Sequence, residues 1–195
     1  MSRKARNTIL SDSCYAHVFS KSIENKYIFS SQRDFLVFKK YLYQYKAKYN
    51  FLLHHYCLMN THFHFLVYIP AVQSFSNALG KLKWRYTNYY NHVHKRSGPL
   101  WRERFKSQLI ADERYLSVCA NYIETNPIRA GMVSAASSWP HSSSRYYENN
   151  QLDKLVDGYD YSCKPVPIDN VNEHIFQRGN VIGPRIIHRR RKSKR

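Results

Sequence analysis

The sequence predicts an α+β protein with the ferredoxin-like split βαβ arrangement, an antiparallel sheet with helices on one face. Three observations lead to this fold class. The periodic segments follow the order β-α-β-β-α-β, and one more helix comes after them. Only two residues separate the second and third strands, which makes those strands antiparallel neighbours. Hydrophobic residues make up 43% of the 195-residue chain, enough for the core of one domain.

The first strand and first helix are predicted from alternation and capping. Residues 14–20, CYAHVFS, alternate loosely and are rich in aromatic and β-branched types, as strands are. A helix over about 32–49 begins after Ser31, which forms a capping box with Asp34 in place of the usual glutamate. Asn50 ends that helix. The predicted buried stripe of the helix consists of Phe35, Phe38, Leu42, Tyr45 and Tyr49.

The next two strands form a hairpin. Residues 51–59 and 62–69 are apolar runs that flank the tight turn Asn60-Thr61. Pro70 breaks the second of these strands because proline cannot donate to a ladder.

The second half of the domain repeats the helix–strand order. A helix is expected over about 72–93, and a fourth strand over 100–110 with a basic outer face. Asp112 caps a last helix over about 113–125, which Pro127 ends. From about residue 148 the periodicity fades. We therefore expect one domain over 1–147 and a partly disordered extension over 148–195 that ends in the basic tail RRRKSKR.

The charge distribution points to a polyanionic partner. The net charge is +18, and ten Lys/Arg but no Asp/Glu lie between Asp34 and Glu103. This favours nucleic acid over a merely soluble basic protein. Membrane-surface binding is a weaker alternative because the basic residues do not form one amphipathic helix. No apolar run reaches the roughly 18 residues of a membrane span, and the four cysteines show no CxxC spacing. We expect a cytoplasmic, nucleoid-associated protein with reduced thiols.

Two histidines lie one residue apart inside the third strand. Side chains alternate along a strand, so His62 and His64 face the same side, with their Cα atoms roughly 6.6–7 Å apart. That spacing lets two imidazoles bind one metal ion. The alternative is a pair of histidines bonded to backbone or solvent. A second such pair, His92 and His94, lies where a helix frays, and there the two side chains diverge.

The last helix carries a tyrosine and an amide one turn apart. Tyr122 and Asn126 lie on the same face, so the amide oxygen could complete a metal shell while the phenol points at its substrate. Tyr122 could instead be one more core aromatic, since the chain has 17 tyrosines. Asn126 precedes Pro127, which disfavours helical geometry there and leaves the direction of the amide open.

Four separated segments resemble the single-tyrosine HUH transposases, and within them the REP-associated tyrosine transposases. The segments are YCLMNTHFHFLV, GPLWRERFKSQLI, YIETNPIRAGMV and SSWPHSSS. The resemblance covers roughly residues 10–147. It implies that His62 and His64 are metal ligands, that Asn126 is a third ligand and that Tyr122 is the nucleophile. The turn Asn60-Thr61 departs from the Pro-Asn that the family commonly has before its first histidine.

The resemblance implies an enzyme that nicks and rejoins single-stranded DNA bearing hairpins or palindromes. Tyr122 would attack a phosphorus atom and leave a 5′-phosphotyrosine link and a free 3′-OH. A divalent ion, Mg²⁺ or Mn²⁺, would polarise the phosphoryl oxygen. Such an exchange needs no ATP. Relatives act as monomers or as homodimers that share active sites, and the sequence leaves both open.

The expected DNA contacts are basic residues on the second helix and the fourth strand: Lys81, Lys83, Arg85, Arg102, Arg104 and Lys106. Interleaved aromatics could stack unpaired bases, or could be core residues: Trp84, Tyr86, Tyr89 and Tyr90. Two other readings stay open. One is a non-catalytic nucleic-acid-binding protein on the same fold. The other is an RRM-like RNA binder, which should carry aromatics where this chain has His62 and His64.

Overall fold

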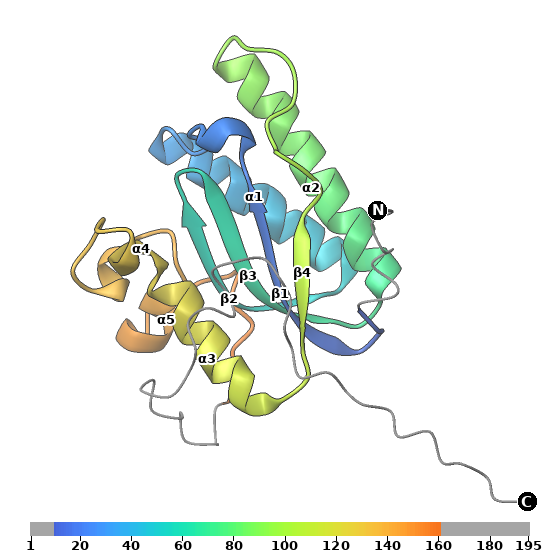
Figure 1. The fold of residues 1–195 in the computed structure, drawn as a ribbon, viewed down its shortest axis with the longest axis vertical. Helices are drawn as coiled ribbons and strands as arrows, with labels where there is room; N and C mark the ends of the chain where they lie inside the picture. Colours follow the sequence, from blue (N-terminus) through green and yellow to red (C-terminus); the bar gives the residue numbers. More distant parts are fainter. Residues whose placement is uncertain (1–9, 161–195) are drawn as a thin grey trace, which may run out of the picture.

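A four-stranded antiparallel sheet lies between two layers of helices in the computed structural model, which describes residues 10–160 (Figure 1). The strands stand in the order β2-β3-β1-β4. The helices α1 and α2 connect β1 to β2 and β3 to β4, so the predicted β-α-β-β-α-β order and fold class are confirmed. The strands are β1 (Cys14–Lys21), β2 (Leu52–Met59), β3 (His62–Ile69) and β4 (Lys106–Ile110). The helices are α1 (Gln32–Tyr49), α2 (Val72–Val93), α3 (Glu113–Glu124), α4 (Asn126–Arg129) and α5 (Ser144–Asn149), with 3-10 turns at Ile23–Asn25 and Ala136–Ser138.

The ends of α1 follow the sequence prediction. The Ser31 side chain accepts a hydrogen bond from the Asp34 amide, and the Asp34 carboxylate accepts one from the Ser31 amide at 2.9 Å. This capping box satisfies backbone donors that the first turn would leave unpaired. At the other end Asn50 takes a left-handed conformation with φ of 50°, which ends the helix.

The main core lies between the sheet and the layer of α1 and α2. Phe63, Phe65 and Val67 alternate along β3 and are fully buried against Phe38 and Leu82 from the two helices. Their neighbours in the sequence point to the opposite face, as the period of a strand requires. The histidine pair of β3 therefore lies on the face away from α1 and α2.

The second face of the sheet is covered, although the sequence predicted helices on one face only. Leu116, Cys119 and Ile123 of α3 pack with Leu66 of β3 and Cys57 of β2 in a second, smaller core. Figure 1 shows α3 crossing this face, on the side opposite α1 and α2. The apolar stripe of α3 had to be buried somewhere, and the sheet face was the available surface.

Two element boundaries differ from the prediction. The fourth strand begins at Lys106 rather than at residue 100, because the segment before it pairs with the chain after β1 through a single Ser22–Trp101 bridge. Pro127 does not stop the helical path. It lies in the first turn of α4, where its missing N–H costs no hydrogen bond, so the chain turns again after Thr125.

Residues 148–160, which the sequence assigned to an extension, lie against the domain. Leu155 is buried in the main core. The Asp157 carboxylate accepts hydrogen bonds from Lys46 Nζ at 2.6 Å and from the Leu53 amide at 2.8 Å. The domain boundary at 147 stays a prediction, and residues 161–195, with the basic tail and Cys163, lie outside the described part of the chain. The other three cysteines, Cys14, Cys57 and Cys119, are free and buried.

Candidate active site

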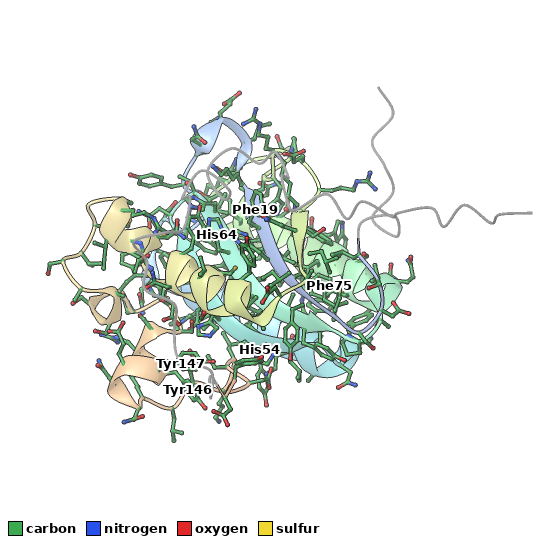
Figure 2. All side chains as sticks on the ribbon, turned by 60° about the horizontal axis from the view of Figure 1, so that its bottom comes forward. Phe19, His54, His64, Phe75, Tyr146 and Tyr147 are labelled. Atoms are coloured by element: carbon green, nitrogen blue, oxygen red, sulfur yellow. The ribbon has the colours of Figure 1, made fainter. Side chains whose placement is uncertain are left out.

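Neighbouring strands enclose the histidine pair of β3. His64 pairs in register with Phe19 on β1 and with Cys57 on β2, so it occupies the middle of the sheet and is 5% exposed. His62 stands at the start of β3 and is half-buried. The centroids of the His62 and His64 rings are 5.1 Å apart, and the two ring planes are nearly perpendicular. Figure 2 shows His64 next to Phe19 and beside α3.

Each imidazole of the pair uses its Nδ1 atom for a hydrogen bond within the chain. His64 Nδ1 is 2.9 Å from Nε2 of His17, a β1 residue that the sequence analysis did not single out. His62 Nδ1 is 2.9 Å from the hydroxyl oxygen of Thr61 in the hairpin turn. A histidine that binds a metal through Nε2 uses its Nδ1–H in this way.

Burial keeps all three imidazoles of the site uncharged near neutral pH. Desolvation lowers the pKa of His17 to about 3. Desolvation, with a smaller effect of nearby Lys21, lowers the pKa of His62 to about 4. The pKa of His64 is held well below its ordinary value, first by burial and then by the neighbouring imidazoles. Neutral imidazole is the form that binds metal ions.

Tyr122, on α3, lies beside His64 and His17. The apolar stripe of α3 packs on the sheet, and Tyr122, next to Ile123 in that packing, is partly buried at its edge. The Tyr122 ring lies edge-on to the His64 ring and to the His17 ring, with centroids 5.8 Å apart in each case. The phenol therefore shares one face of the sheet with the imidazoles, all from a single chain.

Asn126 lies at the junction of α3 and α4 and ties the two together. Its amide nitrogen donates to the carbonyl oxygens of Tyr122 at 2.8 Å and Ile123 at 3.3 Å. These are carbonyls that the end of α3 would otherwise leave without a partner. The amide nitrogen is thus engaged on the α3 side, and the amide oxygen is the atom that a metal ion would use.

Arg129 is a site residue that sequence reasoning missed. Its guanidinium lies over the Tyr122 ring, 4.2 Å from the ring centroid, and donates to the Tyr122 carbonyl oxygen. A second donor reaches the Thr125 hydroxyl at 2.9 Å. The spacing of seven residues is two helical turns, which places both side chains on one face of a continuous helix. That signal was in the sequence, but the expected helix end at Pro127 concealed it.

His62, His64 and Asn126 have the donor chemistry of a divalent metal site. Two neutral imidazoles with engaged Nδ1 atoms and one amide oxygen suit Mn²⁺ better than Mg²⁺. Within residues 10–160 no group of three or more His, Cys, Asp or Glu side chains could hold a metal ion.

The sequence model of the family described as "Transposase IS200 like" matches residues 10–126, which is more than half of the chain. The chain belongs to the IS200-like transposase family. This membership makes it a DNA transposase. The match spans every strand of the sheet and the whole of α3.

Two further comparisons place this IS200-like transposase near the REP-associated group. A protein of Haemophilus influenzae that is named as a REP-associated tyrosine transposase is 26% identical over 120 residues, covering 53% of this chain and 68% of the relative. The solved structure of a REP-associated tyrosine transposase bound to a REP hairpin aligns with a TM-score of 0.61 at 19% identity. It covers 83% of this chain and 96% of that one. The structural likeness supports the fold.

The basic residues predicted to contact DNA divide into three groups. Lys106 is exposed on β4, opposite Phe19 and so on the histidine face, and Arg102 and Arg104 are exposed just before that strand. Lys83 is buried, and its ammonium donates to the Ser20 hydroxyl and the Glu103 carbonyl at 2.7 Å each, so we omit it from the interface.

The third group lies on the far side of the sheet. Lys81 and Arg85 belong to α2, and each lies over a tyrosine ring of α1. Between them Trp84 is 68% exposed, which rules out a core role for it, whereas Tyr86 and Tyr90 are buried. The sheet separates these side chains from Tyr122. No helix within residues 10–160 is long and apolar enough to span a membrane.

Proposed function

We propose that this transposase nicks and rejoins single-stranded, hairpin-bearing DNA through a covalent link to Tyr122. One observation carries the proposal: the Tyr122 ring lies edge-on to His64 of the same chain, on the face of the sheet that also carries Lys106. The DNA class is supported by the REP hairpin bound to the similar solved transposase. The +18 net charge of the chain suits such a polyanionic substrate.

The reaction is a phosphodiester exchange. The Tyr122 oxygen attacks a backbone phosphorus as its proton leaves for a base, and the bond from that phosphorus to the 3′ oxygen breaks. The 3′ oxygen takes up a proton as it leaves. The products are a 5′-phosphotyrosine and a free 3′-OH, and attack by a 3′-OH on the phosphotyrosine rejoins the strand. One phosphodiester replaces another, so no nucleotide cofactor is needed.

The chain's own residues activate and place the phenol. A phenol titrates near pH 10 and is a weak nucleophile at neutral pH without help. A divalent ion held by His62, His64 and Asn126 would withdraw charge from the phosphoryl oxygen when bound. Arg129 lies over the Tyr122 ring and brings a positive charge beside it. Lys106, with Arg102 and Arg104, would grip the flanking phosphates.

A denaturing-gel assay tests the proposal. The protein is incubated with end-labelled single-stranded DNA that carries a hairpin, in the presence of Mn²⁺ or Mg²⁺. We expect a covalent protein–DNA band from the natural protein, and none from Tyr122→Phe. Tyr115→Phe is the matched control, because Tyr115 is an exposed tyrosine of the same helix. If the natural protein forms no adduct with any hairpin-bearing strand, the chain is a non-catalytic DNA-binding member of its family.

A further inference from the structure

Two residues outside the proposed ligand set each contact a histidine of the site at the nitrogen that would not bind the metal. We propose that His17 and Thr61 are positioning residues, which fix the His64 and His62 rings so that both Nε2 atoms face a divalent cation. This inference rests on the proposed function, because that function includes a divalent cation bound by His62 and His64. Its evidence is the pair of 2.9 Å contacts at the two Nδ1 atoms.

His17 can hold His64 only in one protonation pattern if His64 is to bind a metal. A neutral imidazole carries one N–H, and the hydrogen bond between the two rings holds one proton. When His64 donates from Nδ1 to His17 Nε2, its own Nε2 keeps a lone pair for the cation. The reverse pattern puts the proton of His64 on Nε2 and blocks binding. His17 therefore serves as the acceptor that a carboxylate or carbonyl provides in other metal sites.

The surroundings of His17 make it a rigid partner. His17 is 1% exposed, so water cannot take its place beside His64. Its ring is nearly parallel to the His64 ring, with an angle of 16° between the planes, and it stacks on Phe19 as well. Register fixes it further, because β1 pairs with both β3 and β4 at this level of the sheet. The contact with His64 is thus built into the middle of the sheet.

Thr61 is also fixed in place, by backbone hydrogen bonds of the hairpin turn. Its carbonyl oxygen accepts from the Ser22 amide at 2.8 Å, and the preceding Asn60 carbonyl accepts from the Ile28 amide at 2.8 Å. The turn is therefore tied to the chain after β1 on one side. The Thr61 hydroxyl can accept a hydrogen bond from His62 Nδ1. Because Thr61 is only half-buried, water could partly replace this hydroxyl.

The difference in burial predicts a ranking of effects. Loss of an outer-shell partner costs about 10–100-fold in metal affinity. We expect His17→Phe, which keeps an aromatic ring but removes the acceptor, to fall at the upper end of that range. We expect Thr61→Val to fall at the lower end, because water can enter. His17→Gln and Thr61→Ser keep a polar atom at the same reach and should restore much of the affinity.

Mn²⁺ binding without DNA is the direct test, with free Mn²⁺ measured by electron paramagnetic resonance and folding checked by thermal unfolding. His54→Phe is the matched control: His54 is a buried histidine of β2 whose hydrogen bond runs to the Asp157 carbonyl, outside the site. It should lower stability and leave Mn²⁺ affinity unchanged. If His17→Phe does not fold, the comparison of Thr61→Val with Thr61→Ser, together with His17→Gln, decides the matter.

Three results would overturn the inference. The first is that folded His17→Phe and Thr61→Val bind Mn²⁺ as tightly as the natural protein. The second is that the natural protein does not bind Mn²⁺. The third is that His17→Gln loses Mn²⁺ affinity as completely as His64→Gln, which would make His17 a ligand. The proposed function fails separately. If Mn²⁺ affinity follows the predicted ranking but the natural protein forms no DNA adduct, the positioning role stands and the nicking reaction does not.

Discussion

The guanidinium of Arg129 lies over the ring of Tyr122, 4.2 Å from its centroid, and also donates to the carbonyl oxygen of that tyrosine. The same arginine thus fixes both the side chain and the backbone of the proposed nucleophile. Its planar fork makes this double contact possible, and a lysine could not reproduce it. Arg129 is exposed, so it can also meet the negative charge of an arriving phosphate.

Replacing Arg129 should slow covalent attachment of DNA. We expect Arg129→Gln to lower the single-turnover rate of adduct formation by at least about 10-fold, and by at most the roughly 10²–10³-fold that loss of a transition-state donor costs. The rate of Arg129→Lys should lie between those of the natural protein and Arg129→Gln, because lysine keeps the positive charge but not the planar fork. Arg145→Gln, at an arginine bonded to the Ser137 carbonyl, is the control. Equal rates in all variants would exclude a role for Arg129 at the nucleophile.

The end of α3 is anchored to the sheet of its own chain. The Glu124 carboxylate accepts a hydrogen bond from the Ser143 hydroxyl at 2.6 Å, and His55 Nδ1 on β2 lies 2.7 Å from the same oxygen. Glu124 is two residues from Tyr122, so this buried cluster holds the tyrosine beside the histidines of its own subunit. Exchange of α3 between two subunits would have to break this cluster and form it again across the dimer.

Mixing two inactive variants tests this cis arrangement. Tyr122→Phe lacks the nucleophile and His64→Ala lacks a proposed ligand, but each supplies what the other lacks. We expect no adduct from the mixture, because neither chain carries a complete site. Mixtures refolded together from denaturant provide the control for slow subunit exchange. An adduct band in the refolded mixture would show that the tyrosine helix acts across a dimer.

Lys106 should contribute to DNA affinity on the catalytic face. The Lys106 side chain is exposed and lies opposite Phe19 on β1, on the face of the sheet where we propose that the DNA binds. We expect Lys106→Gln to weaken binding of single-stranded DNA and to reduce the salt slope of the binding constant by about 1, as one phosphate contact predicts. Lys81→Gln, on the far side of the sheet, should change the binding of a short strand less. A larger effect of Lys81→Gln would place the bound strand on α2 instead.

Asp34 should make stability fall in acid. Burial alone would raise the pKa of this carboxyl, but hydrogen bonds from His94, Ser31 and Ser30 outweigh it and lower the pKa. The folded protein therefore binds this proton less readily than the unfolded chain. The stabilisation is complete above the unfolded pKa of about 3.9. It is lost as the pH falls through the lower pKa of the folded state.

Asp34→Asn tests this linkage. At neutral pH we expect the free energy of unfolding to drop by about 1–3 kcal/mol, since Tyr89 and His94 lose a charged partner in a buried place. Below pH 4 the difference between the variant and the natural protein should shrink. Urea unfolding at pH 7 and pH 3 measures both values. A constant difference at the two pH values would show that Asp34 does not titrate with folding.

Local chemistry made much of the fold predictable. The capping box of Ser31 and Asp34 fixed the start of α1 because it satisfies the amides of that turn within a few residues. The two-residue turn at Asn60-Thr61 set the hairpin, and the period of a strand put His62 and His64 on one face. Each of these features depends on neighbours in the sequence.

Features that depend on partners distant in the sequence could not be predicted from it. Lys83 was expected to contact DNA, but its ammonium is buried between Ser20 and Glu103, which lie on other segments. His17 gains its place beside His64 only from the pairing of β1 with β3. Arg129 was missed because Pro127 was expected to end the helix, while in the structure the chain turns again. Spacing alone cannot reveal such contacts.

The identity of the residue that carries the DNA decides whether Tyr122 is the nucleophile. The adduct formed with hairpin-bearing single-stranded DNA is digested with nuclease and protease, and mass spectrometry locates the nucleotide. We expect a 5′-nucleotide joined to the Tyr122 oxygen, in a peptide from α3, and a free 3′-OH on the other DNA product. A nucleotide on any other residue, or cleavage without any covalent intermediate, would contradict it.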